Sequence, residues 1–173
     1  MSKTQQIVRA AIIVALAVVF QSLRYFIGAN PFSTYIISSL VNLCLVVAVF
    51  HTGLGGGIAV ALVAPLIALA QGFALAPMVA PIMLGNLSLV LIVYAAKRMR
   101  AYWFSYVGAP LKYLIIAGGM ALMLSSAAET FVAALTAQVV QLITAVIGIT
   151  VAVPVNLALG AQQKKAQEKS RRD

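Results

Sequence analysis

The chain has 173 residues, of which 63% are hydrophobic and 9% are charged, with 12 lysines and arginines, 3 acidic residues and 1 histidine. Soluble domains are about half apolar, so this composition indicates an integral membrane protein. Three acidic residues and one histidine are too few to favour a catalytic centre or an ion relay. The formal net charge of +9 is explained either by the orientation of the chain in the membrane or by binding to a partner.

Apolar runs divide the chain into about six segments that can cross a bilayer as helices, at about 20 residues each. We predict an all-α integral membrane fold, a six-transmembrane-helix bundle that forms one domain over residues 1–173. The expected spans are Ile7–Ile27, Tyr35–Phe50, Gly55–Gly72, Met78–Ala96, Val107–Ala127 and Phe131–Leu159. Residues 160–173 form a basic tail after the sixth span.

The basic residues predict how these spans are oriented. With a cytoplasmic N-terminus, most of them fall on the cytoplasmic side: Lys3, Arg9, Lys97, Arg98, Arg100, Lys164, Lys165, Lys169, Arg171 and Arg172. Only Arg24 and Lys112 lie elsewhere, which satisfies the positive-inside rule. Both termini are therefore expected in the cytoplasm. The tail is interpreted as facing lipid headgroups, without a nucleic-acid partner.

The first span has two alternative interpretations. Met1–Arg9 and the apolar segment after it are similar to a secretory signal peptide, but the bulky, charged segment Gln21–Phe26 stands where a cleavage site would be small. As a retained helix, the span carries the spacing Ala11-x-x-x-Ala15, a small-residue patch that lets another helix approach closely. We expect a retained helix with Ala11 and Ala15 as a partner-docking surface.

The distribution of ionisable residues argues against an enzyme. His51 has no second ligand or base near it, and the acids Glu129, Glu168 and Asp173 are scattered. No catalytic residue, metal site or cofactor is therefore expected. No carboxylate lies within a span and no Gly-x-x-x-x-Gly-Lys string is present, so neither proton coupling nor ATP use by this chain alone is expected. Sodium coupling stays open, because several spans contain proline.

Neutral polar residues share one face in several spans, because they recur every three or four residues. The residues are Gln138, Gln141, Ala145, Gly148, Ala152 and Asn156 in the sixth span, Tyr35, Ser38 and Asn42 in the second, and Asn86 in the fourth. Amides offer donors and acceptors without charge, as a cavity for a small polar organic molecule requires. Alternatively, each amide makes only an interhelical hydrogen bond.

The outer mouth of such a cavity is expected to carry charge and aromatic rings. Arg24 and Glu129 fall there, where they either hold charged groups of a ligand or pair with each other. The turn-rich segment Gly28–Ser33 is a candidate lid. Aromatic rings that can stack on a ligand, or that mark the membrane interface, are those of Phe26, Phe32 and Tyr35.

Lys112 lies near the cytoplasmic end of the fifth span. Its stem is long enough to reach the headgroups, and we expect that position. If it faces inward instead, it marks an anionic ligand or a buried polar network.

The layout resembles the substrate-binding S component of energy-coupling factor (ECF) transporters, the ATP-driven vitamin importers of prokaryotes. The resemblance covers nearly the whole chain and rests on six spans, both termini inside, the Ala11 and Ala15 pattern, and the segments Ser39–Asn42 and Leu84–Leu87. It implies a micronutrient bound near the outer face of a prokaryotic plasma membrane. It also implies partners, namely a transmembrane scaffold (T component), which meets Ala11 and Ala15, and two ATPase subunits.

The expected function is thus capture of a small vitamin or precursor for an ECF-type importer. The candidate substrate-binding residues are Asn86, Gln138, Gln141, Glu129, Arg24, Tyr35 and Asn42. The alternatives are a stand-alone secondary transporter or channel, and an accessory membrane subunit without a ligand. The substrate itself stays open.

Overall fold

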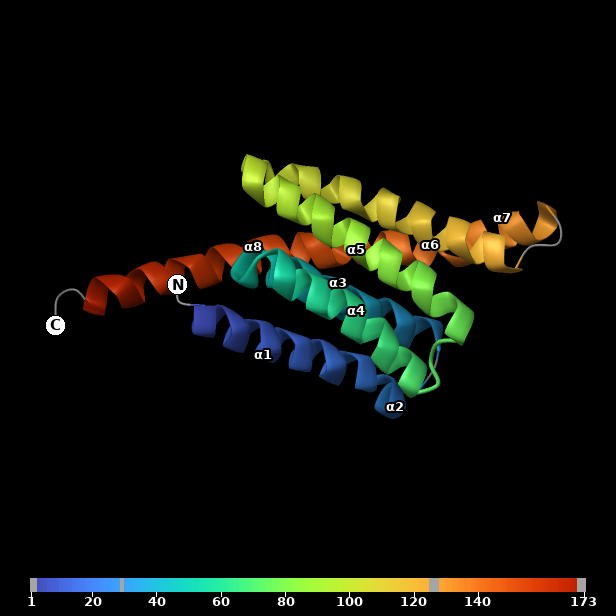
Figure 1. Cartoon of the computed structure of the whole chain (residues 1–173), viewed down its shortest axis with the longest axis horizontal. Coiled ribbons are helices and arrows are strands. Elements are labelled where there is room, and N and C mark those ends of the chain that lie inside the picture. Colours follow the sequence, from blue (N-terminus) through green and yellow to red (C-terminus); the bar gives the residue numbers. More distant parts are fainter. Residues whose placement is uncertain (1–2, 29, 125–127, 171–173) are drawn as a thin grey trace.

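The computed structural model describes residues 3–28, 30–124 and 128–170, with the side chains of all of these except residues 124, 128–131, 134 and 157–170. All regular structure in these ranges is helical. The elements in chain order are α1 (Lys3–Ser22), α2 (Arg24–Ile27), α3 (Pro31–Thr52), α4 (Leu54–Ala70), α5 (Ala76–Met99), the 3-10 helix η1 (Tyr102–Val107), α6 (Gly108–Leu124), α7 (Ala128–Ala137) and α8 (Val139–Ser170). The longer helices form a bundle along one axis, with both ends of the chain at one end of it and α2 and α7 at the other (Figure 1).

Five helical segments within the described ranges are long and apolar enough to cross a membrane. They are Lys3–Ile27, Pro31–Thr52, Ala76–Met99, Tyr102–Met123 and Leu135–Asn156. The structure therefore fits a multi-pass membrane protein, and the predicted all-helical fold is confirmed. The count of six spans stays a prediction, because α4 has only 17 residues, a length of about 25 Å. The side of the membrane on which the termini lie also stays a prediction.

Small residues place α4 in the middle of the bundle, against α1, α3 and α5. A Cβ on Gly57 would lie 2.6 Å from Cγ2 of Val49 and 2.9 Å from Cγ1 of Val90, so only glycine permits this approach. Ala61 and Ala64 continue the same buried face. Hydrophobic burial does not drive helices together inside lipid, so close packing of small residues is the physical basis of this arrangement.

Helix α3 contacts α1, α4, α5 and α8 and forms the centre of the core. Its Leu45 and Val49 pack in one cluster with Leu89 of α5 and Ile149 of α8. Gly148 lets α8 approach α3, since a Cβ there would lie 2.6 Å from Cβ of Asn42. The small face predicted for the sixth span is turned to the interior, where Ala145, Gly148 and Ala152 are buried.

The second membrane helix begins earlier than predicted, at Pro31 and not at Tyr35. Asn30 caps it: Oδ1 of Asn30 accepts from the backbone N–H of Ser33 at 2.8 Å, and Oγ of Ser33 accepts from the backbone N–H of Asn30 at 3.2 Å. This capping box, with proline in the first turn, fixes the helix start. The predicted lid Gly28–Ser33 is therefore wrong in part, because its second half is the start of α3.

The predicted sixth span is interrupted at Gln138, between α7 and α8. The backbone N–H of Gln138 bonds to the carbonyl of Leu135 at 3.3 Å, and that of Gln141 to the carbonyl of Gln138 at 2.8 Å, so the chain tightens there. Oγ1 of Thr136 donates to carbonyls one turn back, an interaction that bends helices. Beyond the apolar region, α8 continues to Ser170.

Candidate functional site

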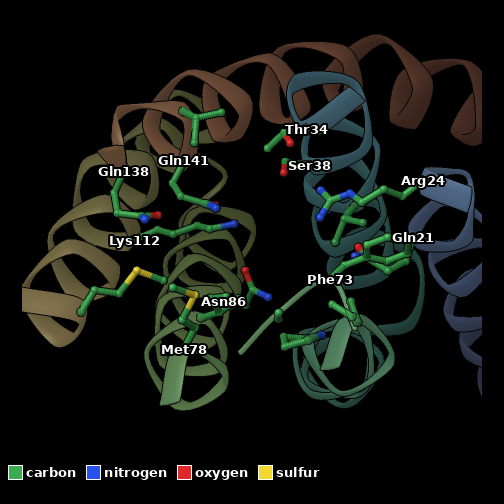
Figure 2. A pocket seen from close by; sticks show the side chains of 18 of the residues that line it. Gln21, Arg24, Thr34, Ser38, Phe73, Met78, Asn86, Lys112, Gln138 and Gln141 are labelled. Atoms are coloured by element: carbon green, nitrogen blue, oxygen red, sulfur yellow. The ribbon is translucent and has the colours of Figure 1, made fainter. Parts of the chain in front are cut away.

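A cavity of about 310 Å³ lies in the half of the bundle away from the chain termini. Volumes of about 300–1,000 Å³ are typical of sites for small ligands. All six long helices contribute to its wall. Its polar lining consists of Gln21, Arg24, Thr34, Ser38, Asn86, Lys112, Gln138 and Gln141. Figure 2 shows these side chains around a common space, and those of Asn86, Lys112 and Gln141 point into it.

Two glutamines reach the cavity from the break between α7 and α8. The side chains of Gln138, at the break, and Gln141, one turn further, both lie at its wall. Neither amide group has a hydrogen-bond partner within the described part of the chain. A break at this depth is tolerated where the backbone lines a cavity and does not face lipid.

Asn86 reaches the cavity from α5 and is 3% exposed. The adjacent Gly85 allows α6 to pack closely, since a Cβ there would lie 2.5 Å from Cγ1 of Ile116 and 3.2 Å from the backbone oxygen of Lys112. This contact brings Asn86 and Lys112 to neighbouring parts of the wall. The Asn86 amide has no hydrogen-bond partner among the described residues.

Lys112 is 2% exposed and faces the interior, so the expectation that it reaches the headgroups is wrong. Its Nζ donates to Oδ1 of Asn42 at 2.5 Å. Nδ2 of Asn42 donates to Oγ1 of Thr144 at 3.3 Å, and Thr144 donates to the carbonyl of Gln141 at 3.4 Å. Although Lys112 is close to the start of α6, its side chain points into the bundle, and its amine therefore does not reach the surface.

The segment between α4 and α5 covers the outer part of the cavity. The ring centroids of Phe73 and Tyr25 lie 4.9 Å apart. Cζ of Arg24 lies 5.4 Å from the ring centroid of Phe73. Oη of Tyr25 donates to the backbone oxygen of Gln71 at 3.2 Å, and Nε2 of Gln71 donates to Oγ of Ser22 at 2.7 Å. These contacts fasten the segment 71–75 to the end of α1 and to α2.

Four of the predicted substrate-binding residues line this one cavity: Arg24, Asn86, Gln138 and Gln141. Asn42 lies behind the wall, where it supports Lys112. Tyr35 lies in a separate apolar groove between α3 and α8, and the side chain of Glu129 lies outside the described residues. The predicted pairing of Glu129 with Arg24 therefore stays a prediction.

Of the two interpretations of the aromatic rings, ligand stacking or the membrane interface, the exposure of Phe26 and Phe32 favours the interface. Phe26 and Phe32 are 86% and 70% exposed and do not line the cavity. Phe73 is the aromatic ring in the wall, and Gln21 and Ser38 are further polar residues there. The sequence contains a signal for one of these three, because Ser38 belongs to the polar face predicted for the second span. Nothing in the sequence singles out Phe73.

Ala11 and Ala15 lie on the outward side of α1, where both are exposed. The inward side of α1 is formed by other residues, among them Ala17 and Gln21. The docking role of Ala11 and Ala15 stays a prediction.

Comparison with protein-family models, with curated proteins and with solved structures found no match to this chain. The helices fit a multi-pass membrane protein, and polar side chains line a half-open cavity between them.

Proposed function

We propose that this protein is the substrate-binding subunit of an ECF-type importer and that the cavity captures a small micronutrient. The observation that supports this best is a half-open cavity at one end of an otherwise apolar bundle, with several polar side chains in its wall. Its amides at Asn86, Gln138 and Gln141 have no hydrogen-bond partner within the described chain. Asn86 is buried and the two glutamines are half-buried. Polar groups withdrawn from bulk water are normally satisfied, and a ligand with several polar atoms satisfies these amides.

The resemblance in layout supports the rest of the proposal. In such importers, a scaffold and two ATPase subunits supply the energy, so the binding subunit needs neither a nucleotide site nor an ion relay. From Ile7 to Val19, the exposed residues of α1 are apolar and include the small residues Ala11 and Ala15, which suits close contact with another membrane helix.

Substitution of the cavity amides tests the binding role. We expect Asn86→Leu and Gln141→Leu each to lower affinity for the native ligand about tenfold, the effect of losing a buried hydrogen bond worth about 1.4 kcal/mol. The ligand is identified by mass spectrometry of small molecules released from the purified protein. Occupancy and thermal stabilisation by that molecule are then measured.

Asn156→Leu is the matched control, because Asn156 is an amide on α8 that does not line the cavity. Equal binding by the cavity variants and the control would mean that the amides serve only as interhelical contacts. Uptake into liposomes that contain this protein alone would instead support the stand-alone transporter.

A further inference from the structure

Among the described residues, the charged side chains of the cavity wall are all cationic. Its described lining contains the cations Arg24 and Lys112 and no aspartate or glutamate. The two cations come from opposite sides of the space, Arg24 from α2 and Lys112 from α6 (Figure 2). A cavity that is otherwise neutral and walled by apolar helices therefore favours an anion.

Lys112 has hydrogen-bonding capacity that the protein does not use. A lysine ammonium has three N–H donors, and one of them bonds to Asn42. The bonds that follow run from Asn42 to Thr144 and from Thr144 to the carbonyl of Gln141, so they return no acceptor to Lys112. Within the described chain, its other donors have no acceptor, although the side chain is only 2% exposed.

Arg24 is in a similar state at the outer part of the cavity. Its Nε is buried and has no hydrogen-bond partner in the structure as described. The ring of Phe73 flanks the guanidinium at 5.4 Å but accepts no hydrogen bond from it. A guanidinium is a donor only, so what this position lacks within the described chain is an oxygen-rich group.

We propose that the ligand is an organic carboxylate whose two oxygens bind Lys112, with Arg24 holding a further polar group near the mouth. This inference rests on the proposed function and specifies its substrate class. Burying a cation without a partner is costly, and an entering carboxylate removes that cost through charge-assisted hydrogen bonds. The free donors of Lys112, together with the neighbouring amides of Asn86 and Gln141, match the two oxygens of a carboxylate.

The test begins with the molecule that the protein carries through purification. Small molecules released from the wild type are analysed by mass spectrometry, together with those from Lys112→Gln, Arg24→Gln and the control Arg98→Gln. Arg98 is an exposed cation of α5 that does not line the cavity. We expect a carboxylic acid in the wild type and the control, and affinity lower by about 30-fold in the Lys112 variant.

Matched probes give a second measurement. Thermal stabilisation is compared for nicotinate and nicotinamide, pantothenate and panthenol, and biotin and its amide, so that each pair differs chiefly in the acid group. Stabilisation by an acid and not by its uncharged counterpart supports the proposal. Inorganic phosphate and a phosphate monoester, glycerol 3-phosphate, are added as separate arms, and preferential stabilisation by either overturns the assignment to a carboxylate.

The remaining outcomes separate this inference from the proposed function. A neutral or cationic native ligand, or undiminished binding in both Lys112→Gln and Arg24→Gln, overturns the anion assignment and leaves the binding role intact. No carried molecule and no stabilising probe would overturn both. Arg24→Gln keeps the inference testable if the Lys112 variant misfolds, because the Arg24 side chain makes no hydrogen bond within the described chain that its loss would break. Each variant must elute as a monodisperse species.

Discussion

At the residue scale, the series from Lys112 through Asn42 and Thr144 to Gln141 is the main polar network of the described interior. Asn42 and Thr144 are each 0% exposed. The network ties α6, α3 and α8 together at the base of the cavity. It holds the amine of Lys112 in a position that the apolar residues around it would not favour.

This network predicts strong coupling between Asn42 and Lys112. Asn42→Ala leaves a buried amine without its acceptor and should lower the free energy of unfolding by about 1–3 kcal/mol. In Lys112→Met/Asn42→Ala, both partners are absent, so the double variant should lose less than the sum of the single losses, with a coupling of about 0.5–3 kcal/mol. Denaturant titration in detergent, followed by circular dichroism, measures all four proteins. Strictly additive losses would contradict the coupling.

At the element scale, glycines decide how closely the helices approach. Gly148 of α8 faces α3, where an added Cβ would lie 2.6 Å from Cβ of Asn42 and 2.9 Å from the backbone nitrogen of Leu43. Gly118 of α6 has nothing within 4 Å of its virtual Cβ. The two positions therefore make a matched pair within helices.

The pair predicts opposite effects of the same substitution. Gly148→Ala should push α8 away from α3 and lower the free energy of unfolding by about 1–3 kcal/mol. Gly118→Ala should raise it by about 0.5–1 kcal/mol, because alanine is the better helix former. Melting temperatures of the wild type and the two variants, measured in one detergent, test both predictions. A tolerated Gly148→Ala would show that the α3 and α8 contact is looser than the structure indicates.

At the scale of the whole molecule, the apolar exterior and the small residues of α1 suit a subunit that contacts another membrane protein. Exposed apolar residues of α1 include Ile7, Ile12 and Leu16, with Ala11 and Ala15 between them. Neither alanine lines the cavity, so the proposed docking surface and the proposed binding site are separate.

This separation predicts that docking can be lost while binding is kept. Ala11→Trp and Ala15→Trp should abolish copurification of the scaffold and ATP-dependent uptake, because an indole prevents close helix approach, and should leave ligand occupancy unchanged. Leu114→Trp is the control, since Leu114 is 58% exposed on α6, away from α1. Normal complex formation by both alanine variants would refute the docking role.

The sequence alone determined the helical class, because long apolar runs in a chain of few charges can satisfy their backbone only as helices in lipid. Helical spacing was also enough to select Gln138 and Gln141, since residues three or four apart share a face, and Asn86 was selected as an amide in the middle of an apolar span. Composition and spacing do not identify which residues of two helices meet. The inward position of Lys112, the supporting role of Asn42 and the cover formed by Phe73 therefore depended on the tertiary structure. They follow from contacts between residues far apart in the chain, such as Lys112 with Asn42 and Tyr25 with Phe73.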